Sequence, residues 1–407
     1  MIMKKKPFLS ILIPTRNRAR YVGYAVQSAI NIPSDDVEIL VSENHSQDNT
    51  KDVLAGFSDH RLRVISPDSP LPMHENWEFL LAESSGEWVY FLGDDDAMMA
   101  HSVEHLRKVV KNYPRVEAIV SPRAYYFWDG VQDQYGDTCL SVNFSSKEVW
   151  RDSKKMLSKC IDGNIDYLSL PQCYSGGFQR RTLINRIKRS QSGIYFKSVT
   201  PDAYSALAAV IHTFRYLEIG VPLAWVGSSP HRSSKTTSAT ELSKDRNADF
   251  IGMHSEDKLT LSYPLGEFKN ITFCLCFYEA CISAFPNTEY SLMSQKMLKR
   301  VFFDFCSKHG RSSEAVDILS KEIGFSIPAF YSVDYFYFLL KKKINTIFVK
   351  VGSLANRIYY RLHKNMEISR FNSEDHVQFP NILAFDDSLA EMYESFEKRF
   401  LANQNKR

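Results

Sequence analysis

The stretch from Trp88 to Ala97, WVYFLGDDDA, joins two segments of opposite character. Residues 88–92 form a short apolar run bounded by Gly86 and Gly93, which is typical of a strand buried on both faces of a sheet. Three carboxylates follow at once, and adjacent negative charges raise one another's pKa unless a positive charge offsets them. Open α/β sheets bind ligands at the carboxyl ends of their strands, so the pattern predicts a divalent cation there, magnesium or manganese. A solvated acidic turn is the alternative, because Asp is common in turns.

The sequence before this stretch alternates strands and helices. Apolar runs predict strands over 8–13, 37–41, 62–65 and 88–92, and helical spacing predicts helices over 21–30, 50–57 and 77–83. This alternation with short links is typical of a parallel α/β sheet. Polar loops follow the strands at Thr15, Glu43 and Asp94, so we expect them at one edge of the sheet. Since no glycine-rich phosphate loop is present, a nucleotide bound there would be held through a metal ion.

Three later features allow more than one interpretation. The aromatic cluster at 125–128 predicts core packing or, less favoured, a stacking platform for a sugar or base. A glycine pair at 176–177 precedes Arg180 and Arg181, which could meet phosphate or remain solvated. A short helix is expected near 149–157.

Length and composition limit the number of domains and the kinds of partner that the chain can have. The chain has 407 residues and a net charge of +3, which gives no argument for a nucleic-acid partner. Near residue 240 Ser- and Thr-rich sequence gives way to long helical patterns, so we expect one domain over 1–240 and a helical C-terminal domain over 241–407. Seven cysteines without a CxxC pair are typical of buried thiols in a reducing compartment.

The sequence predicts a cytoplasmic protein with one candidate membrane contact. No run reaches the roughly 18 apolar residues of a spanning helix, and the apolar run at 8–13 is too short for a secretory signal. Residues 331–364 combine an apolar aromatic run with basic residues at helical spacing. Such a helix can lie on an anionic surface at the inner face of the cell membrane, or pack against its own domain.

A second acidic position stands in the sequence VTPDAY at 199–204. Pro201 suits the first turn of a helix, where its missing N–H costs nothing, and a helix is expected to continue over 203–214. Asp202 falls in the same turn, where a carboxylate complements the helix macrodipole. Without further context, this ordinary helix-start role is the simpler interpretation.

Four motifs together resemble a known family. They are FLSILIPTRNR at 8–18, VSENHSQDNT at 41–50, Asn76-Trp77, and LGDDD at 92–96. In this order and spacing they resemble the inverting family 2 glycosyltransferases of the GT-A fold, over residues 7–235. The resemblance implies an α/β, Rossmann-like fold with a mostly parallel central sheet flanked by helices, followed here by an α-helical C-terminal region.

The resemblance also implies roles for individual residues. Asp202 falls where the family carries its catalytic base, although proline precedes it instead of the usual acidic residue. Asp96 would bind the metal ion and Asp94 the ribose or the metal, while Asp95 joins the nucleotide-sugar contacts or only shapes the turn. Glu43 stands where the family usually has Asp against the nucleobase. The other expected nucleotide-sugar contacts are Pro14, Thr15, Arg16, Asn17 and Asn76, with the loop residues His231 and Arg232 closing over the donor.

The implied activity is metal-dependent, inverting transfer of a sugar from a nucleoside diphosphate sugar, with a UDP-sugar favoured, to a saccharide or lipid-linked acceptor. A carboxylate would accept the proton of the acceptor hydroxyl, and manganese or magnesium would stabilise the leaving diphosphate. Surface polysaccharide or glycolipid synthesis is the expected setting. Two other classes stay open: a nucleotidyltransferase, and a non-catalytic nucleotide-sugar-binding or scaffold protein of a polysaccharide assembly complex.

Overall fold

A computed structural model defines the fold and describes residues 6–131, 140–162, 164–198, 200–230, 368–371, 382–383 and 393–398. The helices are α1 (Val22–Ile30), α2 (Thr50–Ala55), α3 (Met73–Glu83), α4 (Ser102–Asn112), α6 (Ser153–Ile161), α7 (Arg181–Ser190) and α8 (Pro201–His212), with a 3-10 turn η1 (Tyr167–Ser169). The strands are β1 (Leu9–Thr15), β2 (Val37–Glu43), β3 (Leu62–Ile65), β4 (Trp88–Phe91), β5 (Ala97–Met98), β6 (Ala118–Val120), β7 (Ala124–Phe127), β8 (Leu140–Asn143), β9 (Glu148–Asp152), β10 (Gly177–Arg180), β11 (Arg215–Ile219), β12 (Ala224–Ser228) and β13 (Ile368–Phe371).

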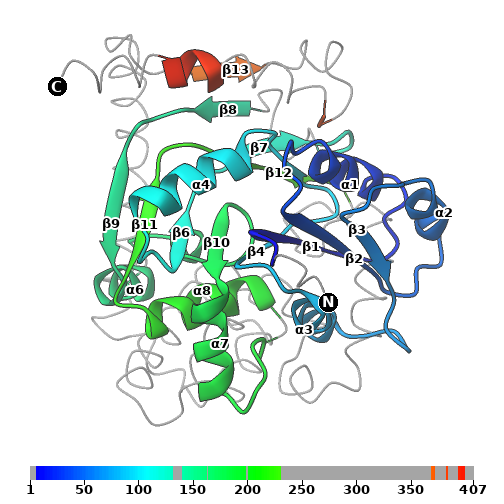
Figure 1. The fold of residues 1–407 in the computed structure, drawn as a ribbon, viewed down its shortest axis with the longest axis horizontal. Coiled ribbons are helices and arrows are strands. Elements are labelled where there is room, and N and C mark those ends of the chain that lie inside the picture. The colour runs from blue at the N-terminus through cyan, green and yellow to red at the C-terminus, as the bar shows by residue number, and fades with distance from the viewer. Residues whose placement is uncertain are drawn as a thin grey trace, which may run out of the picture.

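Eight strands form the central sheet in the order β3-β2-β1-β4-β10-β6-β11-β9 (Figure 1). Strands β3, β2, β1 and β4 pair in parallel, and so do β6 and β11. Strand β10 runs antiparallel between β4 and β6, and β9 runs antiparallel at the edge. Smaller sheets join β5, β12 and β7, and β13 and β8. The predicted α/β class, with a mostly parallel sheet flanked by helices, is confirmed.

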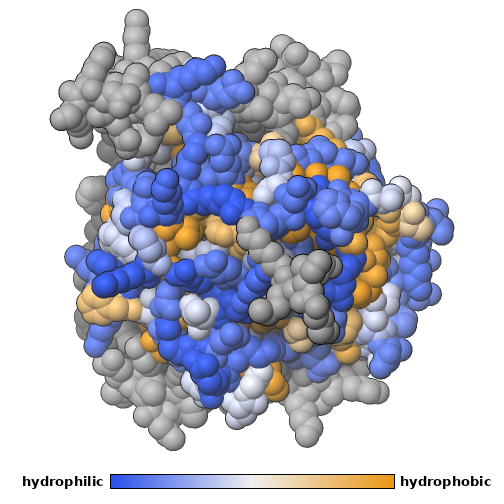
Figure 2. Space-filling model, viewed as in Figure 1, coloured by the Kyte–Doolittle hydropathy of each residue, from blue (hydrophilic) through white to orange (hydrophobic). Residues whose placement is uncertain are grey.

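Alternate residues of the central strands face two apolar layers. Leu12 of β1 and Phe91 of β4 pack with residues of α3, α6, α7 and α8. Ile11 and Tyr90 of the same strands face the other way, toward α1, α4 and the small β5-β12-β7 sheet. In Figure 1, α1 and α4 accordingly lie above the sheet and α3, α7 and α8 below it. Figure 2 shows that the surface in this view is largely hydrophilic, with smaller apolar areas between the polar ones.

Strand β1 extends further than the sequence predicted. We expected Pro14 to end it, because proline cannot donate to a sheet ladder. In the structure Pro14 and Thr15 stay in register with the end of β2. Pairing with β4 on the other side stops at Leu12. Pro14 is therefore tolerated because it lies past the last pairing with β4, where its missing N–H interrupts no bond to that strand.

Two segments differ from the sequence expectations for a local reason. Residues 149–157, expected to be helical, begin as β9 and become helical at Ser153, where Asp152 caps α6 by accepting the Lys155 N–H at 2.7 Å. The glycine pair lies at and just before β10. A β-carbon on Gly177 would lie 1.9 Å from the Gln172 carbonyl oxygen. The close approach that glycine allows is thus to the chain's own backbone.

Short segments of the region after residue 240 are described. Strand β13 pairs with β8, so this region contains a strand that its helical pattern did not predict. Residues 393–398 are helical, and Tyr393 stacks on His101 of α4 with ring centroids 4.0 Å apart. The predicted boundary at 240 and the stretch 331–364 lie outside the described residues. None of the helices in the described part of the chain has the length and apolar character of a membrane span, and Cys160 and Cys173 are buried.

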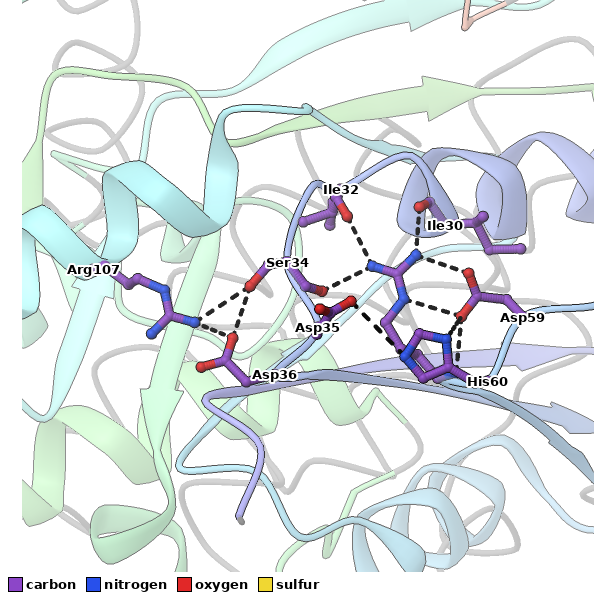
Figure 3. Close-up of polar contacts among 9 residues, drawn as sticks. Ile30, Ile32, Ser34, Asp35, Asp36, Asp59, His60 and Arg107 are labelled. Atoms are coloured by element: carbon purple, nitrogen blue, oxygen red, sulfur yellow. Dashed lines mark hydrogen bonds and ion pairs between the residues drawn. The ribbon is translucent and has the colours of Figure 1, made fainter. Parts of the chain in front are cut away.

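Arginines hold the amino edge of the sheet, where β1 to β4 begin. Arg61, just before β3, is 8% exposed and forms a short ion pair with Asp59 (2.8 Å). Its carbonyl acceptors are Ile30 (2.6 Å), the last residue of α1, and Ile32 (2.8 Å) and Ser34 (2.9 Å) in the segment that follows. These three acceptors and Asp59 are labelled in Figure 3. Hydrogen bonding to Arg61 lowers the pKa of Asp59 to about 2. This guanidinium therefore fixes the entry into two neighbouring strands.

Arg180 and Arg181 belong to the same amino edge, beside the start of β4. Arg181 donates to the Gly86 carbonyl (3.1 Å) and the Ser84 hydroxyl (2.8 Å). Arg180 pairs with Glu87 at 2.6 Å. The sequence left open whether these arginines meet phosphate or solvent. They instead make structural contacts far along the strand from the polar loops.

Candidate active site

The carboxyl edge of the sheet, where the parallel strands end, gathers the polar residues that the sequence singled out. Thr15 ends β1 and lies in register with Glu43, which ends β2. The Thr15 hydroxyl donates to Asp94 Oδ2 at 3.0 Å, just past the end of β4. The predicted meeting of the three loops is therefore observed, and two of them touch directly.

The three aspartates lie in a tight turn. The Asp96 N–H donates to the Gly93 carbonyl at 3.1 Å, and Asp96 Oδ2 accepts the Gly93 N–H at 3.1 Å. A β-carbon on Gly93 would lie 2.6 Å from that carboxylate oxygen, so the turn requires glycine. Asp94 and Asp95 consequently occupy the corner of a β-turn, each with 8% of its surface exposed.

The Asp96 side chain stabilises this turn from its buried side. Its Oδ1 accepts the Gly227 N–H of β12 at 2.7 Å, the Tyr174 side chain is a further hydrogen-bond partner, and no part of the residue is exposed. Burial raises its pKa well above the ordinary value, and the charge of Asp95 adds to the effect. The sequence assigned the metal ion to Asp96, and this assignment stays a prediction.

The two corner aspartates differ in how far they are already paired. Arg18 Nε lies 2.8 Å from Asp94 Oδ1 and forms a buried ion pair with it. Asp95 Oδ2 accepts the Ser229 hydroxyl at 2.5 Å. Its Oδ1 has no hydrogen-bond or ion-pair partner among the described residues. Asp95 therefore presents the most open carboxylate oxygen of the triplet.

The aromatic strand β7 supports the turn from one face. Trp128 Nε1 donates to the Asp95 carbonyl at 2.9 Å, and Trp128 packs edge-on against buried Tyr126. Packing, the favoured interpretation of this cluster, holds for these two residues. Tyr125 and Phe127 alternate with them and form a parallel pair with centroids 6.4 Å apart. Tyr125 is exposed.

The loop after β1 is tied to the loop after β2. Arg16 Nη1 donates to the carbonyls of Asn44 (2.7 Å) and His45 (3.0 Å). Asn17 has a positive φ of 55° and accepts the Gln47 N–H at 2.7 Å. These two predicted contact residues thus fix the loop after β1 against the loop after β2.

Glu43 and Asn76 lie on the same wall. Glu43 Oε1 accepts the Ser46 N–H at 2.6 Å, and its buried Oε2, 3.6 Å from Lys51 Nζ, has no hydrogen-bond partner in the described chain. Asn76 Oδ1 accepts the Ser42 hydroxyl at 2.5 Å. A buried acceptor without a donor is costly, and a ligand N–H would satisfy the one on Glu43.

Asp202 reaches the carboxyl edge from the first turn of α8. This helix leads into β11, which is parallel to β6, so it begins at that edge. The Tyr167 hydroxyl donates to Asp202 Oδ2 at 3.0 Å. Burial raises the pKa of Asp202 although its hydrogen bonds oppose the shift. Burial also raises the pKa of Tyr174, and the charges of Asp95, Asp96 and Asp202 all add to it. The turn and Asp202 therefore share one neighbourhood.

Sequence analysis missed the side chains that hold the aspartates. Arg18 stands inside the first motif, so its charge was a usable signal for a partner of Asp94. Ser229 and Tyr167 are distant in sequence from the aspartates they bind, and no spacing pattern connects them. The predicted loop residues His231 and Arg232 lie outside the described residues.

The carboxyl edge fits a divalent ion that binds together with phosphates. Within the described ranges, no group of three or more His, Cys, Asp or Glu side chains is placed to hold a metal by itself. Magnesium usually takes one or two carboxylates and completes its shell with water and substrate phosphates. Asp95, through its open oxygen, and Asp94, oriented by Arg18, are hard ligands of this kind.

Comparison with known proteins points to one family. The sequence profile described as Glycosyl transferase family 2 matches residues 10–169. The chain is 30% identical over 152 residues to the GalNAc(5)-diNAcBac-PP-undecaprenol beta-1,3-glucosyltransferase of Campylobacter jejuni, covering 36% of this chain and 45% of that protein. It is 26% identical over 105 residues to the UDP-Glc:alpha-D-GlcNAc-diphosphoundecaprenol beta-1,3-glucosyltransferase of Escherichia coli, covering 26% of this chain and 42% of that one.

The matched stretches thus span less than half the length of either relative. Among solved structures, S. aureus TarS 1-349 in complex with UDP-GlcNAc aligns with a TM-score of 0.46 and 13% identity, over 78% of this chain and 92% of that one. The family match supports the resemblance drawn from the motifs.

Proposed function

We propose that this protein is a metal-dependent, inverting glycosyltransferase that moves a sugar from a nucleoside diphosphate sugar to a hydroxyl acceptor. One observation carries the proposal: an acidic turn with an open Asp95 oxygen lies at the same sheet edge as the partly buried carboxylate of Asp202. The match of residues 10–169 to the family 2 profile supports sugar transfer as the reaction. The geometry supplies a donor side and an acceptor side for it.

The donor side consists of the loops after β1, β2 and β4. Asp95 and Asp94 would hold the divalent ion, and Asp96 keeps the turn closed beneath them. When bound, manganese or magnesium supplies Lewis-acid charge for the departing diphosphate. The buried Glu43 Oε2 would accept a base N–H, which a uracil ring offers, so a UDP-sugar is the favoured donor.

The acceptor side is Asp202. An alcohol is a weak nucleophile at neutral pH, and a carboxylate within hydrogen-bond reach accepts its proton as it attacks the anomeric carbon. The C–O bond to the diphosphate breaks in the same displacement, so the anomeric configuration inverts. The raised pKa makes Asp202 a stronger base than an exposed aspartate.

The acceptor class follows from the relatives. The names of the C. jejuni and E. coli enzymes specify saccharides linked through diphosphate to undecaprenol. We extend this to the present chain as a lipid-linked saccharide acceptor, in surface polysaccharide or glycolipid synthesis. Transfer would then take place at the inner face of the cell membrane, with residues 331–364 as the proposed peripheral contact.

A turnover assay tests the proposal. The protein is incubated with common UDP- and GDP-sugars, with and without MnCl2 or MgCl2, and release of the nucleoside diphosphate is measured. We expect metal-dependent release from at least one donor, abolished in Asp202→Asn. Thermal protection by nucleotide and metal without any release would point to the non-catalytic binding protein instead. Neither protection nor release would refute the proposal.

A further inference from the structure

Asp202 is held from outside its own helix by a small polar shell. The Tyr167 hydroxyl in η1 donates to Asp202 Oδ2 at 3.0 Å. The next residue, Leu168, receives a hydrogen bond on its carbonyl from Arg123 Nη2. Arg123 follows the end of β6, so it reaches the carboxyl edge on the side of the base. One short turn therefore links the arginine to the partner of Asp202.

Arg123 is incompletely paired for a residue in such a place. A guanidinium has five N–H donors, yet its Nε is buried and has no hydrogen-bond partner among the described residues. None of the described carboxylates forms a direct ion pair with it. Its charge nevertheless lowers the pKa of Asp202 and that of Tyr167, in both cases against a larger opposing effect of burial. Arg123 thus acts on Asp202 through its charge.

Among the described residues, the titratable groups that act on Asp202 or respond to its charge come from three segments. Tyr167 contributes from η1 and Arg123 from the segment between β6 and β7. Cys173 and Tyr174, from the segment before β10, have pKa values that burial raises and that the charge of Asp202 raises further. Arg123 is the cation among these groups, and Tyr167 is the side chain that donates to the carboxylate.

We propose that Tyr167 and Arg123 are positioning residues for the base: Tyr167 fixes the orientation of the Asp202 carboxylate through its hydrogen bond, and Arg123 provides a positive charge on the same side of the carboxyl edge. The inference rests on the proposed function, because it assumes that Asp202 takes the acceptor proton. Substitution of either residue should therefore change catalysis but not donor binding, because the proposed donor side is formed by Asp94 and Asp95.

The test is the pH profile of kcat/KM for nucleoside diphosphate release, measured with MnCl2 and the nucleotide sugar that the wild type turns over fastest. The variants are Tyr167→Phe, Arg123→Met and Arg123→Lys. In Tyr167→Phe, loss of a hydrogen bond to a charged group should lower kcat/KM about tenfold. Both Tyr167→Phe and Arg123→Met shift the acid limb to higher pH, because the first removes a hydrogen bond and the second a positive charge that favours ionised Asp202. Arg123→Lys keeps the limb near that of the wild type.

Tyr216→Phe is the matched control. The Tyr216 hydroxyl, also buried, donates to the Ser169 carbonyl at 2.8 Å, so it holds the same η1 turn without touching Asp202. We expect its acid limb to stay in place. Thermal protection by UDP and manganese should match the wild type in all four variants, which separates a positioning role from a folding defect.

The outcomes separate this inference from the proposed function. If Asp202→Asn is inactive but the acid limbs of Tyr167→Phe and Arg123→Met coincide with the wild-type limb, only the positioning role is overturned. If Tyr216→Phe shifts the limb equally, the turn as a whole matters and the specific roles are also overturned. If Asp202→Asn retains turnover, both proposals fall.

Discussion

The two edges of the parallel strands use the same residue types in opposite ways. At the amino edge, Arg61 donates to three carbonyls and to Asp59, and Arg181 is similarly engaged. At the carboxyl edge, Asp95 keeps one oxygen without a described partner and Arg123 keeps a buried Nε without one. The hydrogen bonds of Arg61 and Arg181 hold the amino edge together, whereas the open groups of Asp95 and Arg123 could each accept a further partner.

The direction of the pKa shifts draws the same contrast. Hydrogen bonding to Arg61 lowers the pKa of Asp59 to about 2 at the amino edge. Burial raises the pKa of Asp96 and of Asp202 at the carboxyl edge. Ionised carboxylates therefore stabilise the first edge and cost folding free energy at the second. Substitutions at the two edges should consequently separate stability from activity.

The largest effect is expected at Asp202. Asp202→Asn should lower turnover by about a thousandfold, within the range for loss of a general base, and should not lower the melting temperature. Because the folded-state pKa is raised, the ionised form disfavours folding at neutral pH, and the neutral amide removes this cost while still accepting from Tyr167. Calorimetry beside the turnover assay checks both parts. A variant with a much lower melting temperature and a proportionate loss of turnover would contradict the expected separation of stability from activity.

Arg61 tests the amino edge. Arg61→Met should destabilise the protein by about 3 kcal/mol, because three backbone carbonyls and the partly buried Asp59 carboxylate lose their donor. Arg63→Met, two residues further on in β3, is the matched control, since the Arg63–Glu83 pair is about half exposed and such pairs contribute below about 1 kcal/mol. Denaturant unfolding measures the difference. Equal destabilisation by the two substitutions would contradict the role given to Arg61.

Within the acidic turn, Asp96 and Asp95 should behave differently. Asp96→Ala leaves the partly buried N–H groups of Gly93 and Gly227 without acceptors, which should cost about 3 kcal/mol. Asp95→Ala removes the acceptor of one buried hydroxyl, that of Ser229, and we expect a smaller cost of about 1 kcal/mol. Chemical denaturation of both variants without ligand makes the comparison. A larger loss of unfolding free energy in Asp95→Ala than in Asp96→Ala would contradict the roles given to these two residues.

The smallest expected effect concerns acid stability. Asp59 has a folded pKa of about 2 against an ordinary value of 3.8. A depressed folded pKa contributes stability that is present above the unfolded value and lost as pH falls from 3.8 through about 2. The wild type should lose this contribution over that window, and Arg61→Met should lack it. Unfolding free energies between pH 5 and 2 provide the check, and parallel curves for the two proteins would count against it.

The sequence predicted which residues meet at the carboxyl edge of the sheet, but not which of them bind one another there. Buried strands at 8–13 and 88–92, followed by polar loops, place Thr15 and Asp94 together by the geometry of parallel sheets alone. The choice among three adjacent aspartates could not be predicted, because it depends on Gly227 from β12, which binds Asp96 from 131 residues away.

Long-range contacts explain the other differences as well. Arg180 and Arg181 read as candidate phosphate ligands, but β10 runs antiparallel to β4 and carries them to the amino edge. Tyr167 and Arg123 have no local signal, since their role depends on where η1 and β6 lie relative to α8. Strand direction and distant partners are the information that residue spacing lacks.

The most direct measurement compares donor binding in two variants. Thermal shift with UDP and manganese is recorded for Asp202→Asn and Asp95→Asn. We expect protection equal to that of the wild type in Asp202→Asn, because the proposed base belongs to the acceptor side, and loss of protection in Asp95→Asn, because that carboxylate would hold the metal ion together with the diphosphate. Equal protection in both variants, or loss in Asp202→Asn alone, would contradict the division of the carboxyl edge into a donor side and an acceptor side.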